Sequence, residues 1–315
     1  MLMDTATVAS FEASRNRLAS LAYRLLGSAA DAEDTVQDAF LRWQAADRGY
    51  VEVPEAWLTK VVTNLALDRL RSATTRRERA VGAWMPEPLL DGDPMLGPAD
   101  TVEQRESVTL AVLMLMERLS PIERAVYVLR EAFSYSHAET AEILDITESA
   151  SQQYLHRARR RIAAAGTTTE TDRATARRIV EAFVAAASSG RTEQLVALLT
   201  DDATGISDGA GLGWAAKLIR YATPQRIASA VRAGFKPTPA KRKLAGGSPA
   251  IHAAVVNACP AMIATLDDRV VGVLILEVRD DKIAGVRGIA ARQRLGRLTE
   301  EWQRQEHDVP LIESW

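Results

Sequence analysis

Residues 136–165 read SHAETAEILDITESASQQYLHRARRRIAAA, and this stretch decides the fold of the middle of the chain. Ser136, followed three residues later by Glu139, is a capping box, which predicts that a short helix begins here. Residues 145–147 predict a tight turn, and a longer helix follows over 148–165. Two helices joined by a turn of three or four residues, the second polar at its start and rich in arginine further on, are typical of a helix-turn-helix.

The second helix of this motif carries side chains suited to DNA. Polar side chains early in such a helix can reach base edges in the major groove, and arginines later in it can hold phosphates. A run of arginines is, by itself, more often a solvated helix face. The candidate DNA-contacting residues are Ser149, Ser151, Gln152, Gln153, His156, Arg157 and Arg160.

Residues 8–80 predict a separate helical domain, in which one helix has an acidic face. Ser28 and Asp31 form the capping pattern at the start of this helix. Val36, Phe40 and Trp43 recur at helical spacing and form its buried stripe. A second face combines like charges four residues apart, which weaken an isolated helix. A basic partner surface would explain that face, and a merely solvated acidic face is the alternative; its residues are Asp34, Gln37, Asp38 and Leu41.

Three further segments complete the chain. Residues 81–104 are rich in Pro and Gly and acidic, and they predict an extended linker between the first domain and a second one over 105–166. Residues 171–295 begin with a helical pattern and end in strands, of which 270–278 reads as a buried strand followed by a turn and a returning strand. The polar residues 296–315 predict a mobile tail.

Composition excludes several classes of protein. The chain has 315 residues, a formal net charge of −2, one cysteine and four histidines. A single cysteine excludes an intramolecular disulfide and is typical of a reducing cytoplasm. The sequence contains no metal-ligand cluster and no apolar run long enough to span a bilayer, so we expect no metal, no cofactor and no membrane association.

The helical parts resemble the extracytoplasmic-function (ECF) sigma factors of the sigma-70 family. Residues 21–27 (LAYRLLG), the acidic-faced helix and residues 56–71 resemble sigma region 2. Residues 117–124 (ERLSPIER) and 155–160 (LHRARR) flank the helix-turn-helix and resemble region 4. The resemblance implies two mainly α domains, a helical bundle and a helix-turn-helix.

The resemblance also implies partners and contacts. Region 2 would dock its acidic-faced helix on the clamp of the largest subunits of core RNA polymerase, and region 4 would contact the flap and the −35 element of promoter DNA. The −10 element would be contacted from the last helix of region 2. The residues implied there are Asn64, Asp68, Arg69, Arg71 and Arg76.

The remainder resembles a subgroup of these sigma factors that bears a C-terminal SnoaL-like (NTF2-like) α+β cone. Residues 84–88 (WMPEP) resemble a linker signature of this subgroup, with Met85 in place of Leu. A regulatory motif is matched by Asp208, Gly209, Ala210 and Gly211, but its lysine is absent, and residues 290–295 depart from a second motif. The resemblance implies a regulatory domain, hollow enough for a small-molecule ligand, whose effect could have either sign.

Two other interpretations stay open. The chain could be an independent helix-turn-helix regulator that binds its operator without polymerase. It could instead be a SnoaL-type enzyme, with Asp201, Asp202, Asp208, His252 and Asp267 as candidate acids and bases, although no spacing among them indicates a site. We predict a cytoplasmic sigma factor without catalytic activity, which directs core polymerase to promoters.

Overall fold

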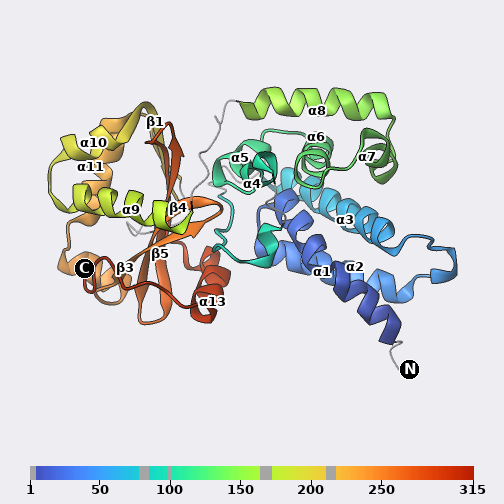
Figure 1. Cartoon of the computed structure of the whole chain (residues 1–315), viewed down its shortest axis with the longest axis horizontal. Coiled ribbons are helices and arrows are strands. Elements are labelled where there is room, and N and C mark those ends of the chain that lie inside the picture. The colour runs from blue at the N-terminus through green and yellow to red at the C-terminus, as the bar shows by residue number, and fades with distance from the viewer. Residues whose placement is uncertain (1–4, 78–84, 98–100, 164–171, 211–217) are drawn as a thin grey trace. The chain divides into compact units, whose positions relative to one another are not determined.

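The computed structural model describes residues 5–77, 85–97, 101–163, 172–210 and 218–315 (Figure 1). The chain divides into two compact units. Unit 1 comprises Met1–Val81, Gly92–Val108 and Val112–Ala165, and unit 2 comprises Gly82–Asp91, Thr109–Ala111 and Gly166–Trp315. No helix in these described parts is long and apolar enough to cross a membrane.

The first part of unit 1 is a bundle of three helices. They are α1 (Thr5–Leu26), α2 (Ala29–Ala45) and α3 (Pro54–Arg77), with a short 3-10 turn, η1 (Arg48–Tyr50), before the third. The predicted stripe of α2 is largely confirmed, because Val36 and Trp43 are buried and Phe40 packs its ring 4.9 Å from Phe11. Burial of these apolar side chains fixes which face of α2 is left for solvent or a partner.

The described part of unit 1 contains five further helices, although Leu110 and Ala111 at the start of one of them belong to unit 2. Capping explains where several of these helices begin. They are α4 (Val102–Glu106), α5 (Leu110–Met116), α6 (Pro121–Tyr127), α7 (His137–Leu144) and α8 (Glu148–Ile162), with a 3-10 turn η2 (Pro94–Leu96) and a π-helical turn η3 (Val128–Ala132). Thr101, Ser120 and Ser136 form reciprocal capping boxes at α4, α6 and α7. Asp145 ends α7 in the left-handed conformation, and Thr147 caps α8. The predicted helix-turn-helix is therefore confirmed.

Within unit 1 the bundle contacts the helix-turn-helix and the residues that precede it through polar side chains. Lys60 Nζ of α3 donates to Asp145 Oδ1 at 2.7 Å. Arg17 Nη1 donates to Thr59 Oγ1 at 3.1 Å, and the guanidinium also bonds the Tyr135 hydroxyl. Arg24, fully buried in α1, donates to Ser107 Oγ at 2.9 Å, and burial lowers its pKa to about 9.

Unit 2 is an α+β fold built on one six-stranded sheet. Its strands are β1 (Leu199–Ser207), β2 (Ile219–Tyr221), β3 (Ala250–Val256), β4 (Cys259–Leu266), β5 (Arg269–Arg279) and β6 (Lys282–Ile289), in the order β2-β1-β6-β5-β4-β3. Neighbours are antiparallel except β1 and β6, which are parallel. The buried strand predicted over 270–278 and its returning partner are β5 and β6.

Helices α9 (Arg173–Ser188), α10 (Thr192–Leu198), α11 (Pro224–Phe235) and α12 (Pro239–Ala245) accompany this sheet (Figure 1). Phe183 of α9, Leu195 of α10 and Ile227 of α11 form one apolar core with Leu276 and Val286 of the sheet. The other strand faces hold a buried ion pair, in which Arg287 Nη2 lies 2.6 Å from Glu277 Oε2.

The prediction of a mobile tail over 296–315 is wrong. Residues Gly296–Arg304 form α13, in which Leu298 and Trp302 are buried. Ile251 of β3 exchanges backbone hydrogen bonds with Leu311 and Ile312, so the edge of the sheet is extended by this segment. The segment looked polar because its few apolar side chains are spaced for one narrow buried stripe rather than a continuous run.

Candidate polymerase and promoter interface

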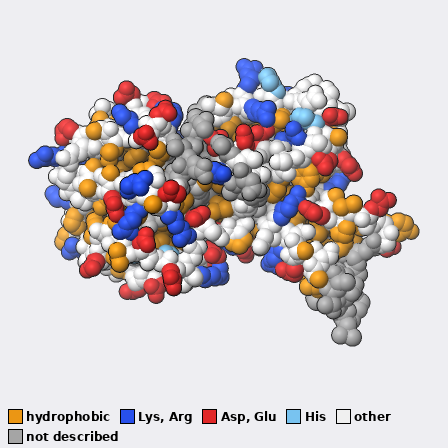
Figure 2. All heavy atoms as spheres, in the orientation of Figure 1, with side chains coloured by type: hydrophobic (Ala, Val, Ile, Leu, Met, Phe, Trp, Pro, Cys, Tyr) orange, Lys and Arg blue, Asp and Glu red, His pale blue; other side chains and the backbone are white. Residues whose placement is uncertain are grey.

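Helix α8 presents one stripe to solvent and the opposite stripe to the core. Leu155, Ala158 and Ile162 are buried. Spacing of three, four or seven residues places the polar side chains on the other side of the helix. Figure 2 shows arginine and histidine side chains gathered over α8. Six of the seven predicted DNA-contacting residues are exposed there: Ser149, Gln152, Gln153, His156, Arg157 and Arg160.

Ser151 is the exception, and the prediction that it contacts DNA is wrong. Its side chain is fully buried, and its hydroxyl lies 2.9 Å from His137 Nδ1 of α7. Burial, aided by Arg130, lowers the pKa of His137, which favours a neutral ring as the partner of the hydroxyl. Ser151 therefore joins the two helices of the motif and does not face a ligand.

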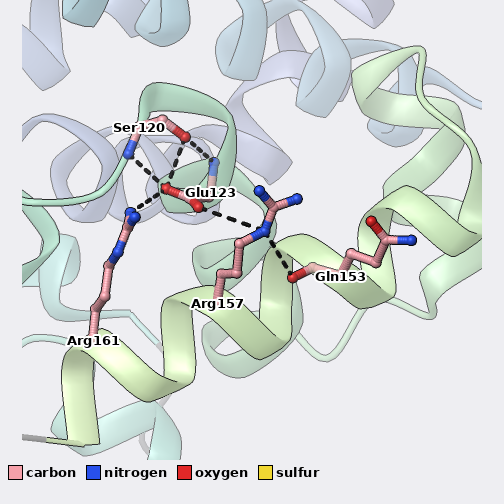
Figure 3. Close-up of polar contacts among 5 residues, drawn as sticks. All are labelled: Ser120, Glu123, Gln153, Arg157 and Arg161. Carbon is pink, nitrogen blue, oxygen red and sulfur yellow. Dashed lines mark hydrogen bonds and ion pairs between the residues drawn. The ribbon is translucent and has the colours of Figure 1, made fainter.

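A buried carboxylate lies beside two of the four arginines of α8 (Figure 3). Glu123 accepts hydrogen bonds from Ser120 N and Ser120 Oγ, both at 2.9 Å, and from Arg161 Nη1 at 2.6 Å. Arg157 Nε lies 4.0 Å from the same carboxylate. Burial alone would raise the pKa of Glu123, but the Ser120 hydrogen bonds and the two guanidinium groups outweigh it and hold the pKa below its usual value.

In the sequence, Glu123 stands out only as part of the segment 117–124 that resembles region 4, because a local pattern says nothing of partners 34 and 38 residues away. A local pattern likewise does not predict that Arg159 pairs with Glu131, at a distance of 2.9 Å between the guanidinium and the carboxylate. Three of the four arginines in 157–161 thus contact acids that precede the motif. Arg160 is exposed on the stripe that faces solvent.

The acidic face of α2 is exposed as predicted. Asp34 and Gln37 are exposed, Asp38 is half-buried, and Leu41 keeps 54% of its surface in solvent. An exposed leucine between carboxylates suits a partner surface that is both apolar and basic.

Arg69 differs from its prediction as a −10 contact. Its guanidinium lies 2.7 Å from Asp38 and 4.0 Å from both Asp31 and Asp34. Arg69 therefore lies against the acidic face of α2, because its guanidinium group is attracted more strongly by the three carboxylates there than by water. Along α3, Asn64, Asp68 and Arg71 share a different face, with Arg71 and Asp68 paired at 3.2 Å. The side chain of Arg76 lies outside the described part of the chain.

The middle of the predicted extended linker is hydrogen-bonded to the turn between β3 and β4. Leu90 forms an antiparallel bridge with Val256, and Asp91 N donates to Val255 O at 2.9 Å. Asn257 N donates to Leu89 O at 2.9 Å, and Leu89 N donates to Asn257 Oδ1 at 2.8 Å. We call residues 89–91 the linker strand. It belongs to unit 2, where Met85, Leu89 and Leu90 are buried.

The predicted regulatory motif holds the end of β6. Asp208 is buried, and its Oδ2 accepts hydrogen bonds from Ala290 N at 3.0 Å and Ala291 N at 2.8 Å. Gly209 has a φ of +73°, which glycine adopts readily, and Ala210 N donates to Asp208 Oδ1 at 3.1 Å. Burial lowers the pKa of Arg294, an effect that the charges of Asp208 and of Glu87 in the linker oppose. Gly211 lies outside the described residues.

In the described part of the chain, no group of three or more His, Cys, Asp and Glu side chains is arranged to hold a metal ion. The candidate acids and bases of an enzyme are also dispersed. Asp202 pairs with Arg279, Asp208 holds the backbone of 290–291, and His252 packs its ring 5.0 Å from Trp302. These side chains do not converge on one site.

Comparison with known proteins agrees with this arrangement. Residues 11–76 match the family model "Sigma-70 region 2", and residues 109–162 match "Sigma-70, region 4". The ECF RNA polymerase sigma factor SigJ of Mycobacterium tuberculosis is 41% identical over 205 residues, which are 65% of each chain. The probable ECF RNA polymerase sigma factor SigI of the same species is 37% identical over 205 residues, 64% of this chain and 69% of the relative.

The whole fold also has a solved counterpart. The crystal structure of the M. tuberculosis extracytoplasmic function sigma factor SigJ superposes with a TM-score of 0.67 and 30% identity, over 91% of this chain and 97% of that one. The similarity includes unit 2, whose fold is the SnoaL-like (NTF2-like) α+β domain that the sequence predicts. Two sigma regions in order, a relative matched over more than two thirds of its length and a shared fold lead to one conclusion: this chain belongs to the ECF RNA polymerase sigma factors.

Proposed function

We propose that this sigma factor docks on core RNA polymerase through α2, contacts the −10 element from α3 and reads the −35 element with α8. The observation that carries the proposal is the stripe of exposed side chains on α8, which lies opposite the buried stripe and includes Arg157 beside the Glu123 carboxylate. A recognition helix needs this division, because one side must pack while the other enters the major groove.

The polymerase-docking surface consists of Asp34, Gln37, Asp38 and Leu41. Its partner would be the clamp of the largest subunits, and region 4 would contact the flap. Carboxylates around an exposed leucine provide attraction to a basic surface and an apolar anchor at its centre. Arg69 would keep the three acids of α2 oriented before binding.

We propose that the −10 contacts come from Asn64, Asp68 and Arg71, which share one face of α3. An opened strand requires cations for its phosphates and polar groups for its bases. Arg71 supplies a cation, and Asn64 supplies both a donor and an acceptor. We propose that the protein works in the cytoplasm, where promoter DNA and polymerase are found, and that it acts by binding rather than by catalysis, as sigma factors do.

Unit 2 would restrain initiation through the linker strand. In this family the linker threads polymerase near its active centre, and the same segment here is paired with the β3–β4 turn. It cannot occupy both places. Because unit 2 is part of the same chain, its effective concentration at the linker would be about millimolar, enough to compete with a separate partner.

Run-off transcription with purified core polymerase tests the docking surface. Leu41→Asp and Asp38→Arg should each lower promoter-dependent transcript by at least about tenfold, since both changes oppose a basic, apolar partner. Glu12→Arg, an exposed acid on α1 paired with Arg15, serves as the matched control and should transcribe normally. Normal transcription from both docking variants would refute the assignment of α2. Tight operator binding without polymerase would favour an independent regulator instead.

A further inference from the structure

Unit 2 contains a cavity of about 630 Å³ that the proposed contacts with polymerase and promoter DNA do not use. It lies between the sheet and helices α11 and α12, with walls from β1, β4, β5 and β6. Trp315 closes part of it, and this residue is fixed by a hydrogen bond from its Nε1 to Phe235 O at 2.8 Å. The volume is within the range that holds small-molecule ligands in proteins.

The wall of this cavity is mostly apolar. Met262 and Leu274, on central strands of the sheet, are only half-buried although helices cover that face. Leu244 of α12 leaves 54% of its surface exposed and also lines the cavity. Exposed apolar surface in a concave site is costly in water and favours an apolar occupant.

Glycine keeps the floor of the cavity open. A Cβ atom built on Gly272 of β5 would meet only the backbone oxygen of Ile289, at 3.8 Å, which is an ordinary contact. Any larger side chain at this position would therefore extend into free space. Gly272 therefore preserves the volume of the cavity, and no tight turn requires a glycine at this position.

The charged side chains of the described wall are all cationic. Among the described lining residues, the ionisable side chains are Lys241, Arg269, Arg292 and the phenol of Tyr221; none is Asp, Glu, His or Cys. Lys241 is committed to the carbonyl oxygens of Gly234 at 3.1 Å and Lys236 at 2.8 Å. Arg269 and Arg292 are exposed, so their guanidinium groups can turn toward an anion at the cavity.

We propose that this cavity binds an amphipathic carboxylate, with the apolar body against Met262, Leu274 and Leu244 and the carboxylate against Arg269 and Arg292. The described wall contains no Asp, Glu or His side chain, and Lys241 is held by backbone carbonyl oxygens, so we assign the site to binding rather than to catalysis. The inference concerns unit 2 and does not depend on the contacts proposed for polymerase or promoter DNA.

Isothermal titration calorimetry on the full-length protein tests the proposal, with dodecanoate, dodecanol and dodecylammonium as probes below their micelle-forming concentrations. Dodecanoate should bind with one site per chain, and the uncharged and cationic probes should bind at least about tenfold more weakly. Equal affinity for dodecanol would overturn the assignment of the anionic group. No binding of dodecanoate would overturn the proposed ligand class.

Variants locate the site. Gly272→Leu fills the cavity and should abolish binding. Leu244→Glu places a carboxylate in the cavity wall at an already exposed position. It should also abolish dodecanoate binding, without disturbing the core. Arg269→Glu with Arg292→Glu should weaken dodecanoate by about tenfold or more, while Arg220→Glu with Arg226→Glu, two exposed arginines of unit 2 outside the cavity wall, should not. Undiminished binding by the Gly272 and Leu244 variants would overturn the location.

Discussion

Glu123 shows how one buried carboxylate can serve a DNA-reading helix from a distance. Its carboxylate accepts a hydrogen bond from the backbone of Ser120 at the start of α6. The same carboxylate lies beside the guanidinium groups of Arg161 and Arg157 of α8. Its contacts with the two arginines are charge-assisted, so their loss should be measurable.

Replacing this carboxylate by an amide should destabilise the protein in a pH-dependent way. Glu123→Gln should lower the free energy of unfolding by about 1–3 kcal/mol at neutral pH. A carboxyl whose pKa is lower in the folded state stabilises the fold above its unfolded pKa, near 4.5, and this stabilisation is lost as the pH falls through the folded value. Urea unfolding at several pH values should therefore show that the variant and the unchanged protein become more alike in their free energy of unfolding below about pH 4.5. Glu142→Gln, an exposed acid of α7, is the control; an equal loss there would contradict the role of Glu123.

Ser151 and Gln152 are neighbours in sequence with opposite roles. Ser151→Ala removes the hydrogen bond to His137 and should cost about 1 kcal/mol of stability without changing promoter choice. Gln152→Ala should leave stability unchanged and alter the dependence of transcription on the −35 sequence, because its side chain is exposed on the reading stripe. Thermal unfolding and run-off transcription on promoters with substituted −35 elements separate the two effects. A changed −35 preference in the Ser151 variant would contradict its buried position.

The sequence predicted residue types well and side-chain directions less well. Polarity made Ser151 and Gln152 equivalent candidates, and only packing against His137 separates them. Arg69 was grouped with basic residues of α3, but its partners lie on another helix 31 to 38 residues earlier. Neither contact leaves a trace in local pattern, because both depend on how helices pack.

At the scale of elements, local signals were sufficient where an element is determined by its own residues. The capping box at Ser136 and the strand pair β5 and β6 were both predicted. The linker strand was not, because a segment of Pro and acidic residues becomes a strand only by pairing with a turn more than 160 residues later in the chain. Long-range pairing of this kind has no local sequence signature.

The turn that receives the linker strand offers a precise test of the proposed restraint. Asn257 and Ala258 both have positive φ, near 49° and 60°, as a tight hairpin turn requires. Asn257→Gly keeps that conformation but removes the oxygen that accepts from Leu89 N. Hydrogen exchange of residues 85–91 should accelerate by about tenfold, and transcription should rise.

Ala258→Gly also keeps the positive φ of the turn and leaves the Asn257 oxygen in place, so it is the matched control, with exchange and transcription like those of the unchanged protein. Faster exchange without any gain in transcription would contradict the restraint, while unchanged exchange would mean that Asn257 does not hold the linker strand.

At the scale of the whole molecule, the contacts within unit 1 conflict with binding to a promoter. Lys60 of region 2 and Asp145 of region 4 are in direct contact at 2.7 Å, and Arg17 contacts Tyr135. The −10 and −35 elements are roughly 25 base pairs apart, or about 85 Å along the duplex at 3.4 Å each. Two regions held together by side-chain contacts cannot occupy both elements, so these contacts must break when polymerase is bound.

A cross-link between the two regions should therefore abolish function reversibly. The only native cysteine, Cys259, is fully buried and burial raises the pKa of its thiol, so it should not react with maleimides. Lys60→Cys with Asp145→Cys, joined by a short bis-maleimide that contains a disulfide, should fail in run-off transcription and recover when the linker is reduced. The same reagent on Lys60→Cys alone should leave transcription intact, which separates cross-linking from modification. Full activity of the cross-linked protein would mean that regions 2 and 4 need not separate, and the arrangement within unit 1 would then have no bearing on promoter recognition.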